Sequence, residues 1–298
     1  MIYSVLKTLE AILKTPKFLL SQNSADYYEY LGDDVLEGQH GGFEDGKKPL
    51  WLNLGYWSTA RTYPDACVAM ASLVAEAARL DGGRELLDVG FGFAEQDFFW
   101  IERYGVKRIA GLNITELHVD RAKQRVTERG LEDRMDLRLG SATEMPFEAG
   151  TFDAVTALEC AFHFDTREKF FAEAFRVLRP GGTIATADVL PEPGYAPMNF
   201  VNRMALKRWA TPLANVYDRN EYGRKLEAHG FTNVSCQSIR NHVFPGATKY
   251  AELRKSGVTM KDAVVSLSEK EITDCYGIKN WEPTGLTDYV IFSAEKPG

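Results

Sequence analysis

Two glycines follow a short apolar run that ends in an acidic residue. The stretch "ELLDVGFGFAEQDFFWI" begins at residue 85 and carries Asp88, Gly90 and Gly92 at alternate positions. Without a Cβ, glycine adopts conformations closed to other residues and lets a ligand approach the backbone. Dinucleotide loops add a third glycine beside the pyrophosphate, but here Ala94 comes sooner. The pattern alone also fits a buried strand and turn. As a ligand loop, it favours a nucleoside cofactor without a pyrophosphate, with Asp88 holding a polar end of the cofactor.

A second group of reactive side chains follows about seventy residues later. "ECAFHF" places Glu159 and His163 after an apolar run, and "TADVL" places Asp188 at the end of the next run. A histidine with an ordinary pKa near 6.5 suits removal of a proton from an alcohol, and a carboxylate orients the ring and stabilises the imidazolium. The alternative is a structural histidine that caps a turn, with Asp188 as a helix N-cap.

The elements around these residues alternate regularly. From residue 85 onward, short apolar runs of strand type alternate with segments of helical periodicity. This order predicts βαβ units and an α/β fold, a Rossmann-like doubly wound sheet with helices on both faces. Ligands bind at the carboxyl ends of parallel strands, beside the point where strand order reverses. The Gly90 loop, "ECAFHF" and "TADVL" all follow strands, so they are expected at one edge.

Several motifs in sequence order resemble one family. "LDVGFGFAEQDFFW", "GLNITELHVDRA", "GSATEMPFEAGTFDAVTALECAFHF" and "FFAEAFRVLRPGG" are similar to segments of class I S-adenosylmethionine-dependent methyltransferases, over about residues 25–298. The small-molecule branch, with its sugar O-methyltransferases of natural-product biosynthesis, is the nearest resemblance. It implies a seven-stranded sheet, mostly parallel, with "TDYVIFSAEKPG" as an antiparallel last strand. The pair His163 and Asp188 resembles the His and Asp of the sugar O-methyltransferases.

The resemblance also implies the cofactor and its contacts. S-adenosylmethionine would be the methyl donor and S-adenosylhomocysteine the product. "LWLNLGYW" resembles a segment that closes over the cofactor. The cofactor-binding residues implied are Asp88, Gly90, Gly92, Gln96, Asn113, Ile114, Ser141, Ala142, Glu159, Tyr28 and Trp57. Asn113 and Ser141 stand where the family usually has acidic residues, and an amide still accepts and donates hydrogen bonds.

The sequence outside the alternating pattern predicts helical cap elements. We expect an N-terminal helical cap segment at 1–80 and a methyltransferase core at 81–298, with cap insertions at about 190–218 and 241–283. The first insertion has an apolar set expected to bind substrate, namely Phe200, Met204, Trp209 and Tyr217. An apolar face favours a bulky, mostly hydrophobic small-molecule acceptor.

The N-terminus and the composition exclude other classes. Ile2, Val5, Leu6, Leu9, Ile12 and Leu13 lie at helical spacing among charged residues. This amphipathic helix is too short and too charged to span a bilayer or act as a signal peptide, so we expect it on the protein body, with peripheral membrane contact or a substrate cover as alternatives. A net charge of -7 argues against a nucleic-acid partner. Four scattered cysteines indicate reduced thiols in the cytoplasm. A homo-oligomer is compatible with the sequence.

The main hypothesis is methyl transfer to a hydroxyl of a hydrophobic natural product, and two alternatives stay open. One is C-methylation of an isoprenoid, prenyl diphosphate or sterol double bond, where Glu159 and aromatic rings stabilise a carbocation and His163 removes the last proton. For a diphosphate, Arg203, Lys207 and Arg208 would meet the phosphates, with magnesium. Otherwise the histidine spacing predicts no metal site. The other alternative is a cofactor-binding protein without activity.

Overall fold

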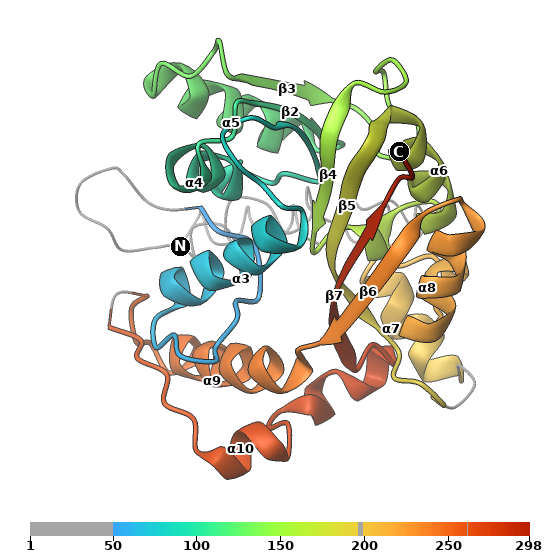
Figure 1. Ribbon diagram of the computed structural model, residues 1–298. Helices are drawn as coiled ribbons and strands as arrows, with labels where there is room; N and C mark the ends of the chain where they lie inside the picture. The colour runs from blue at the N-terminus through green and yellow to red at the C-terminus, as the bar shows by residue number, and fades with distance from the viewer. Residues whose placement is uncertain (1–49, 196–198, 261) are drawn as a thin grey trace, which may run out of the picture.

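One seven-stranded sheet forms the centre of the molecule (Figure 1). The computed structural model describes residues 50–195, 199–260 and 262–298. The strand order is β3-β2-β1-β4-β5-β7-β6. The strands are β1 (Glu85–Val89), β2 (Arg108–Asn113), β3 (Met135–Leu139), β4 (Phe152–Leu158), β5 (Leu178–Leu190), β6 (Thr232–Ser238) and β7 (Asp288–Glu295). β1 to β5 are parallel, and β7 is antiparallel to both β5 and β6. The predicted Rossmann-like, mostly parallel sheet with an antiparallel last strand is confirmed.

Helices cover both faces of the sheet. They are α3 (Tyr63–Ala77), α4 (Glu95–Tyr104), α5 (Glu116–Glu128), α6 (Arg167–Val177), α7 (Phe200–Arg208), α8 (Arg219–Ala228), α9 (Phe244–Lys255) and α10 (Glu269–Thr273). Short 3-10 turns are η1 (Ala161–His163), η2 (Leu213–Asn215), η3 (Arg240–His242), η4 (Ile278–Asn280) and η5 (Glu282–Thr284). Figure 1 shows α3, α4 and α5 on one side of the sheet and α6 and α8 on the other. Right-handed crossovers place them so, because the chain runs outward from β1 in one direction and from β4 in the other.

Each face of the sheet has its own hydrophobic core. Neighbouring strand residues point to opposite faces, and Leu86 and Leu87 are both fully buried, one in each core. A parallel strand covered on both faces reads as a continuous apolar run. This is why "ELLDV" shows no alternation of polar and apolar residues.

The segments predicted as caps are helical where they are described. Residues 1–49, with the predicted amphipathic helix and Tyr28, lie outside the described residues. α3 begins at an N-cap, Thr62, and packs against α4 and the sheet. The range 190–218 contains α7 and η2, and 241–283 contains α9, α10 and turns. Their closure over a ligand stays a prediction. No helix within the described ranges is long and apolar enough to cross a membrane.

A fully buried ion pair ties the end of β5 to the start of α6. Arg167 Nε donates to Asp188 Oδ2 at 2.8 Å, and both side chains have no exposed surface. Arg167 Nη2 also donates to the carbonyl of Val189 at 3.1 Å, and the guanidinium carbon lies 5.2 Å from the ring centre of Tyr217 and 5.5 Å from that of Tyr222. Burial raises the pKa of Asp188, while the charge of Arg167 opposes that rise. The hydrogen bonds and the ion pair thus compensate both side chains for the water lost on burial.

We expect Asp188→Asn to destabilise the fold by about 3 kcal/mol, because it leaves a buried guanidinium without its counter-charge. Chemical denaturation measures this change. Asp274→Asn is the matched control, since Asp274 pairs with Lys270 at the surface, and its unfolding midpoint should stay near that of the wild type. Equal midpoints for the two variants would contradict a structural role for the buried pair.

Candidate active site

A cavity of about 590 Å³ lies at the carboxyl ends of β1, β2, β3 and β4. Its size is within the range of roughly 300–1,000 Å³ that small-molecule sites occupy. The lining residues are Leu50, Leu52, Asn53, Gly90, Phe91, Gly92, Phe93, Gln96, Leu112, Asn113, Ile114, Thr115, His118, Gly140, Ser141, Ala142, Thr143, Leu158, Glu159, Cys160, His163, Phe164, Asp165 and Pro212. Most of the polar residues predicted from the sequence therefore meet in one place, where strand order reverses.

The loop after β1 has a backbone that requires its glycines. Gly90 has φ +75° and Gly92 has φ +56°, in the left-handed region. A Cβ on Gly90 would lie 2.6 Å from the Cβ and Sγ of Cys160, and one on Gly92 would lie 2.8 Å from Leu52 Cδ1. Ala94 stands near the position where dinucleotide loops carry a third glycine. It also has a positive φ, of 60°. The stretch is thus a close-packed loop that opens onto the cavity, and its contact with the cofactor stays a prediction.

Asp88 lies beneath this loop and not in the cavity lining. Its carboxylate is fully buried and accepts from Gln96 Nε2 at 3.0 Å and from Thr156 Oγ1 at 2.7 Å. Burial raises the pKa of Asp88 to about 7, against these hydrogen bonds. Gln96 does line the cavity, and it also donates to the carbonyl of Phe91 at 3.1 Å. Asp88 therefore supports the loop through Gln96, and a direct contact of its carboxylate with the cofactor stays a prediction.

The ends of β2 and β3 supply the residues expected there. Asn113, Ile114, Ser141 and Ala142 all line the cavity. Asn113 Oδ1 accepts from the backbone N–H of Thr115 at 3.0 Å, which orients the amide. Ser141 Oγ lies 2.8 Å from Thr143 Oγ1. These positions agree with the expected edge, and the cofactor contacts of the four residues stay predictions.

Glu159 lies at the end of β4 in a strained conformation. Its φ of 54° is rare for a residue with a side chain, and such strain concentrates at functional sites. Glu159 Oε1 accepts from the N–H of Leu54 at 2.7 Å and from the hydroxyl of Tyr289 at 2.5 Å. Burial raises the pKa of Glu159 to about 7, and the two donors oppose the rise. A carboxyl group whose pKa lies near 7 therefore borders the cavity.

His163 borders the same cavity from the turn η1. Its Nδ1 lies 3.2 Å from the carbonyl oxygen of Ala210. A carbonyl can only accept, so the proton of the neutral ring is on Nδ1 and the lone pair is on Nε2. Burial lowers the pKa of His163 to about 4, and the positive charge of Arg167 lowers it further. The hydrogen bonds to backbone carbonyls oppose this lowering. The ring is neutral at physiological pH.

The predicted pairing of His163 with Asp188 is corrected. The carboxylate of Asp188 accepts from Arg167 Nε and, at 2.9 Å, from the N–H of Val189, and Asp188 does not line the cavity. A backbone carbonyl, that of Ala210, takes the place that the sequence assigned to a carboxylate. The physical reason is competition, because a buried arginine binds a carboxylate more strongly than a neutral imidazole does.

Trp57 is structural and not a cavity residue. Its indole is buried and donates to the carbonyl of Leu54 at 2.8 Å. A Cβ on Gly246 of α9 would lie 2.0 Å from Trp57 Cγ, so the glycine leaves room for the ring. Leu52 and Asn53, from the same "LWLNLGYW" stretch, line the cavity instead. The stretch thus reaches the cavity through residues other than Trp57, and its closure over the cofactor stays a prediction.

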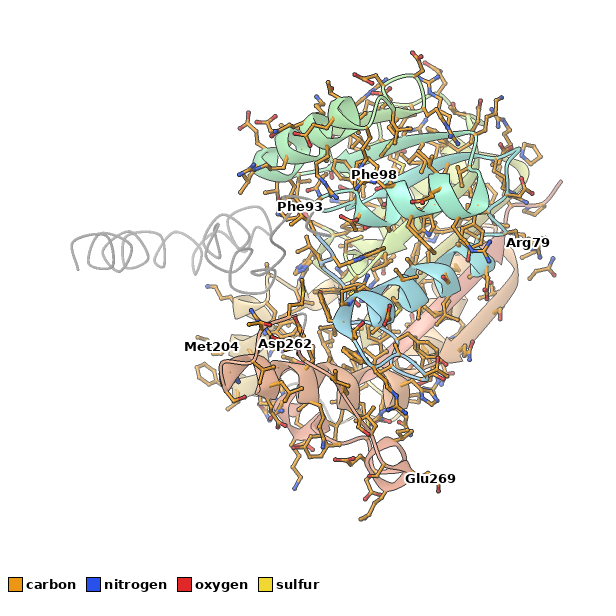
Figure 2. All side chains as sticks on the ribbon, turned by 90° about the vertical axis from the view of Figure 1, so that its left-hand side faces the viewer. Arg79, Phe93, Phe98, Met204, Asp262 and Glu269 are labelled. Carbon is orange, nitrogen blue, oxygen red and sulfur yellow. The ribbon has the colours of Figure 1, made fainter. Side chains whose placement is uncertain are left out.

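The residues predicted to bind substrate are not part of the cavity lining. Phe200 is 76% exposed and Met204 is 49% exposed on α7. Trp209 packs edge-on against Trp281 at 5.0 Å, and Tyr217 packs on Arg167. None of the four predicted residues lines the cavity. Phe93 does line the cavity, and Figure 2 shows Met204 well separated from it. Charged α7 residues Arg203 and Lys207 are also absent from the lining.

Several lining residues were missed as site residues. Phe93 and His118 bring their rings to 4.5 Å of each other, and Cys160 Sγ donates to the carbonyl of Val89 at 3.0 Å. Phe164 follows His163 directly, so its place in the site was predictable. Pro212 reaches the cavity from the loop before α8, and no local pattern marks it.

The comparisons with known proteins identify the class of enzyme. A methyltransferase domain family matches residues 87–186. Erythromycin 3''-O-methyltransferase of Saccharopolyspora erythraea is 36% identical, over 91% of this chain and 89% of its own length. The 27-O-demethylrifamycin SV methyltransferase of Amycolatopsis mediterranei is 29% identical, over 86% of this chain and 94% of its own length. In structure, the [4+2]-cyclase SpnF has a TM-score of 0.69 at 22% identity, over 93% of this chain and 97% of its own.

A mostly parallel seven-stranded sheet with a glycine-cradled cavity at its switch point defines a Rossmann-like methyltransferase. The chain belongs to the class I S-adenosylmethionine-dependent methyltransferases. Within that class it is an enzyme of the natural-product type, active in secondary metabolism. S-adenosylmethionine is its cofactor. The residues fit that group, because the cavity of about 590 Å³ brings the backbone of Gly90 and Gly92 together with Asn113 and the apolar Ile114.

Gly90→Ala should lower the affinity for S-adenosylmethionine by at least roughly tenfold, about 1.4 kcal/mol, because the new methyl group meets Cys160. The control is Gly150→Ala, since Gly150 has φ +67° and nothing within 4 Å of the added Cβ. Both variants should lose about 1 kcal/mol of folding stability from the left-handed backbone, and only the first should lose affinity by calorimetry. Undiminished affinity in folded Gly90→Ala would show that the loop does not bind the cofactor.

Proposed function

We propose that the protein transfers a methyl group from S-adenosylmethionine to a hydroxyl of a hydrophobic natural product, with His163 as the general base. The observation that supports it most is the neutral His163 ring at the cavity, fixed through Nδ1 by the carbonyl of Ala210. In this tautomer the lone pair is on Nε2, the nitrogen that we propose accepts the proton. S-adenosylhomocysteine is the expected product.

The chain offers distinct groups for each part of the cofactor. When bound, S-adenosylmethionine supplies an electrophilic methyl group on a positively charged sulfur. The amide of Asn113 suits the ribose hydroxyls, since its oxygen is already used by Thr115 and its N–H groups donate. Ile114 and Ala142 give the adenine an apolar surface at the cavity wall. Gln96 and the glycine loop suit the methionine end, and the carboxylate of Glu159 suits its positive charge.

Proton removal and positioning are the tasks left to the protein. In-line displacement needs the acceptor oxygen held near the methyl group, and its proton must leave as the new bond forms. The hydroxyl proton becomes strongly acidic as oxygen attacks, so a histidine with a pKa near 4 still accepts it. Glu159, with a pKa near 7, is the second group able to change its charge at the cavity.

The relatives and the lining support a neutral hydroxyl acceptor. The erythromycin enzyme is named a 3''-O-methyltransferase, and the rifamycin enzyme is named for an O-demethyl substrate. Among the described residues that line the cavity, none is lysine or arginine. A diphosphate needs cationic partners, or a metal ion held by acidic residues. In the described part of the chain no group of three or more His, Cys, Asp or Glu residues is placed to hold a metal. C-methylation of a prenyl diphosphate is therefore the weaker candidate.

For a prenyl diphosphate acceptor, the support comes from the fold. Geranyl diphosphate C-methyltransferase of Streptomyces coelicolor has a TM-score of 0.61 at 20% identity, over 78% of this chain and 81% of its own. A C-methylated isoprenoid or sterol would need a base after carbocation formation, and His163 also suits that task. Cytoplasmic location is a further proposal, supported by four free cysteines.

The direct experiment is incubation with S-adenosylmethionine and a panel of acceptors. The panel contains glycosylated macrolides, aglycones, sterols and geranyl diphosphate, with product analysis by mass spectrometry and NMR. We expect an O-methyl group on a glycosylated or polyketide hydroxyl. A new methyl group on carbon would overturn the proposal.

We expect His163→Ala to lower turnover by roughly 10²- to 10⁴-fold with cofactor affinity retained. His229→Ala is the matched control, because His229 Nδ1 also meets a carbonyl, that of Lys225 at 2.8 Å, but lies off the cavity. Its turnover should stay normal. Normal turnover in His163→Ala would mean that positioning alone carries the transfer.

The pH profile should separate His163 from Glu159. The pKa of His163 is lowered to about 4, so the ring is neutral and able to accept a proton across about pH 5 to 8. Any acid limb near pH 7 then reports Glu159, whose pKa is raised to about 7. We expect Glu159→Gln to remove that limb. A limb near pH 6.5 that persists in Glu159→Gln and vanishes in His163→Ala would contradict these assignments.

Phe164→Leu should raise the KM for the acceptor by roughly fivefold, because it removes apolar surface from the cavity wall. Phe200→Leu is the control, since Phe200 is exposed and outside the lining. Steady-state kinetics with each substrate varied measures both. If Phe200→Leu raises the KM and Phe164→Leu does not, α7 selects the acceptor after all.

A further inference from the structure

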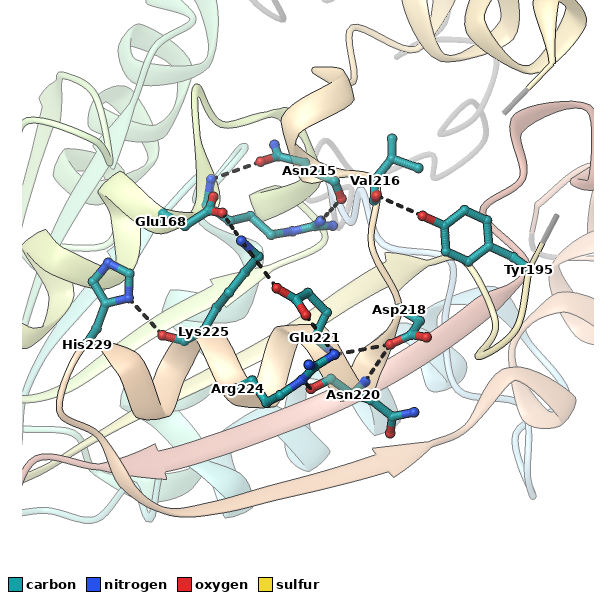
Figure 3. Close-up of polar contacts among 11 residues, drawn as sticks. Glu168, Tyr195, Asn215, Val216, Asp218, Asn220, Glu221, Arg224, Lys225 and His229 are labelled. Atoms are coloured by element: carbon teal, nitrogen blue, oxygen red, sulfur yellow. Dashed lines mark hydrogen bonds and ion pairs between the residues drawn. The ribbon is translucent and has the colours of Figure 1, made fainter. Parts of the chain in front are cut away.

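A buried amide contacts the backbone on both sides of His163. Asn215 Nδ2 donates to the carbonyl of Phe162 at 3.1 Å and to that of Phe164 at 2.6 Å. Asn215 Oδ1 accepts from the backbone N–H of Arg167 at 3.0 Å. The residue has no exposed surface, and Figure 3 shows it in the loop before α8, with its amide reaching toward the start of α6. One side chain thus satisfies three backbone groups of the loop that carries His163.

The same stretch of chain also reaches the imidazole ring. Ala210, five residues before Asn215, provides the carbonyl that lies 3.2 Å from His163 Nδ1. Pro212, between them, lines the cavity. The segment 210–215 therefore fixes His163 twice, through its ring and through its backbone.

The buried ion pair fixes this segment in turn. Arg167 Nη1 donates to the backbone carbonyl of Asn215. Arg167 Nε is held by Asp188 at the end of β5, at 2.8 Å. The contacts form a continuous chain from the sheet to the loop that carries the ring, in the order Asp188, Arg167, Asn215 and the carbonyls of Phe162 and Phe164. The carboxylate that sequence reasoning assigned to the ring thus reaches the histidine loop through Arg167 and Asn215, and also directly through the backbone of Phe162.

We propose that Asn215 is a positioning residue for methyl transfer, holding the His163 loop so that Nε2 faces the acceptor hydroxyl. The inference rests on the proposed function, in which His163 is the base. An asparagine is suited to the task because one amide donates two hydrogen bonds and accepts one. Aspartate lacks the donors, and leucine lacks all three groups at similar volume.

The first test is the kinetics of Asn215→Leu. A misplacement of about 1 Å costs about 10²-fold in rate, so we expect kcat to fall by roughly ten- to a hundredfold. The KM for acceptor and the Kd for S-adenosylmethionine should change by less than about twofold, because Asn215 lines no part of the cavity. The control is Asn220→Leu, at an exposed position of α8, which should leave kcat unchanged.

A double-mutant cycle shows whether Asn215 acts through His163. In a His163→Ala background, Asn215→Leu should lower kcat by less than about twofold, because the ring it positions is gone. An equal fold-loss in both backgrounds would overturn the proposal. Long-range ¹H–¹⁵N spectra, with His163 assigned by its loss in His163→Ala, give a second readout. The Nδ1–H tautomer should dominate in the wild type and decrease in Asn215→Leu, and an unchanged tautomer would overturn the proposal.

The outcomes separate this inference from the proposed function. If His163→Ala keeps normal turnover, the proposed base is wrong and the positioning role falls with it. If His163→Ala loses turnover and folded Asn215→Leu does not, the base stands and the positioning role is wrong. Should Asn215→Leu fail to fold, Asn215→Ser, which retains one donor, replaces it in the same cycle with the same criteria.

Discussion

The pairing of β1 with β4 determines where everything else in this protein can lie. The two strands run parallel, with Leu86 beside Ala154 and Val89 beside Ala157. From β1 the chain proceeds outward to β2 and β3, and from β4 it proceeds the other way to β5. The loops after these two strands therefore separate, and a crevice opens between them. Cys160 touches the carbonyl of Val89 at its base, and only glycine fits at position 90 beside it. The position of the cavity therefore follows from the order of the strands, whatever side chains line it.

Sequence reasoning predicted the sheet and much of the site for the same reason. The ends of strands can be predicted from the apolar runs and from the order of the elements along the chain. The cavity residues that lie at or after such ends are Asn113, Ser141, Glu159 and His163. The direction in which a side chain points, and the residue that it contacts, cannot be predicted in this way. Asp188 was correctly placed at the end of β5 but not paired with Arg167, which lies twenty-one residues earlier.

The errors outside the strand ends have a different origin. Phe200 and Met204 are apolar and helical, and such a pattern indicates a buried face without saying what buries it. Trp57 was assigned to the cavity with its neighbours, although its ring turns toward α9 because Gly246 leaves the space. Asn215 had no signal at all, since its contacts depend on three segments that meet only in the folded chain. Local patterns predict elements, and contacts between elements decide which residues form the site.

One contact described above also bears on the order in which the molecule is assembled. The hydroxyl of Tyr289 on β7 binds Glu159, and β7 lies between β5 and β6 although it follows both in the chain. The sheet therefore keeps a gap until its last strand enters, and Glu159 lacks one of its donors until then. Contacts between such distant positions form late in folding, because the loop they close is long. The cavity wall at the end of β4 is therefore complete only once β7 lies between β5 and β6, because Glu159 then has both of its donors.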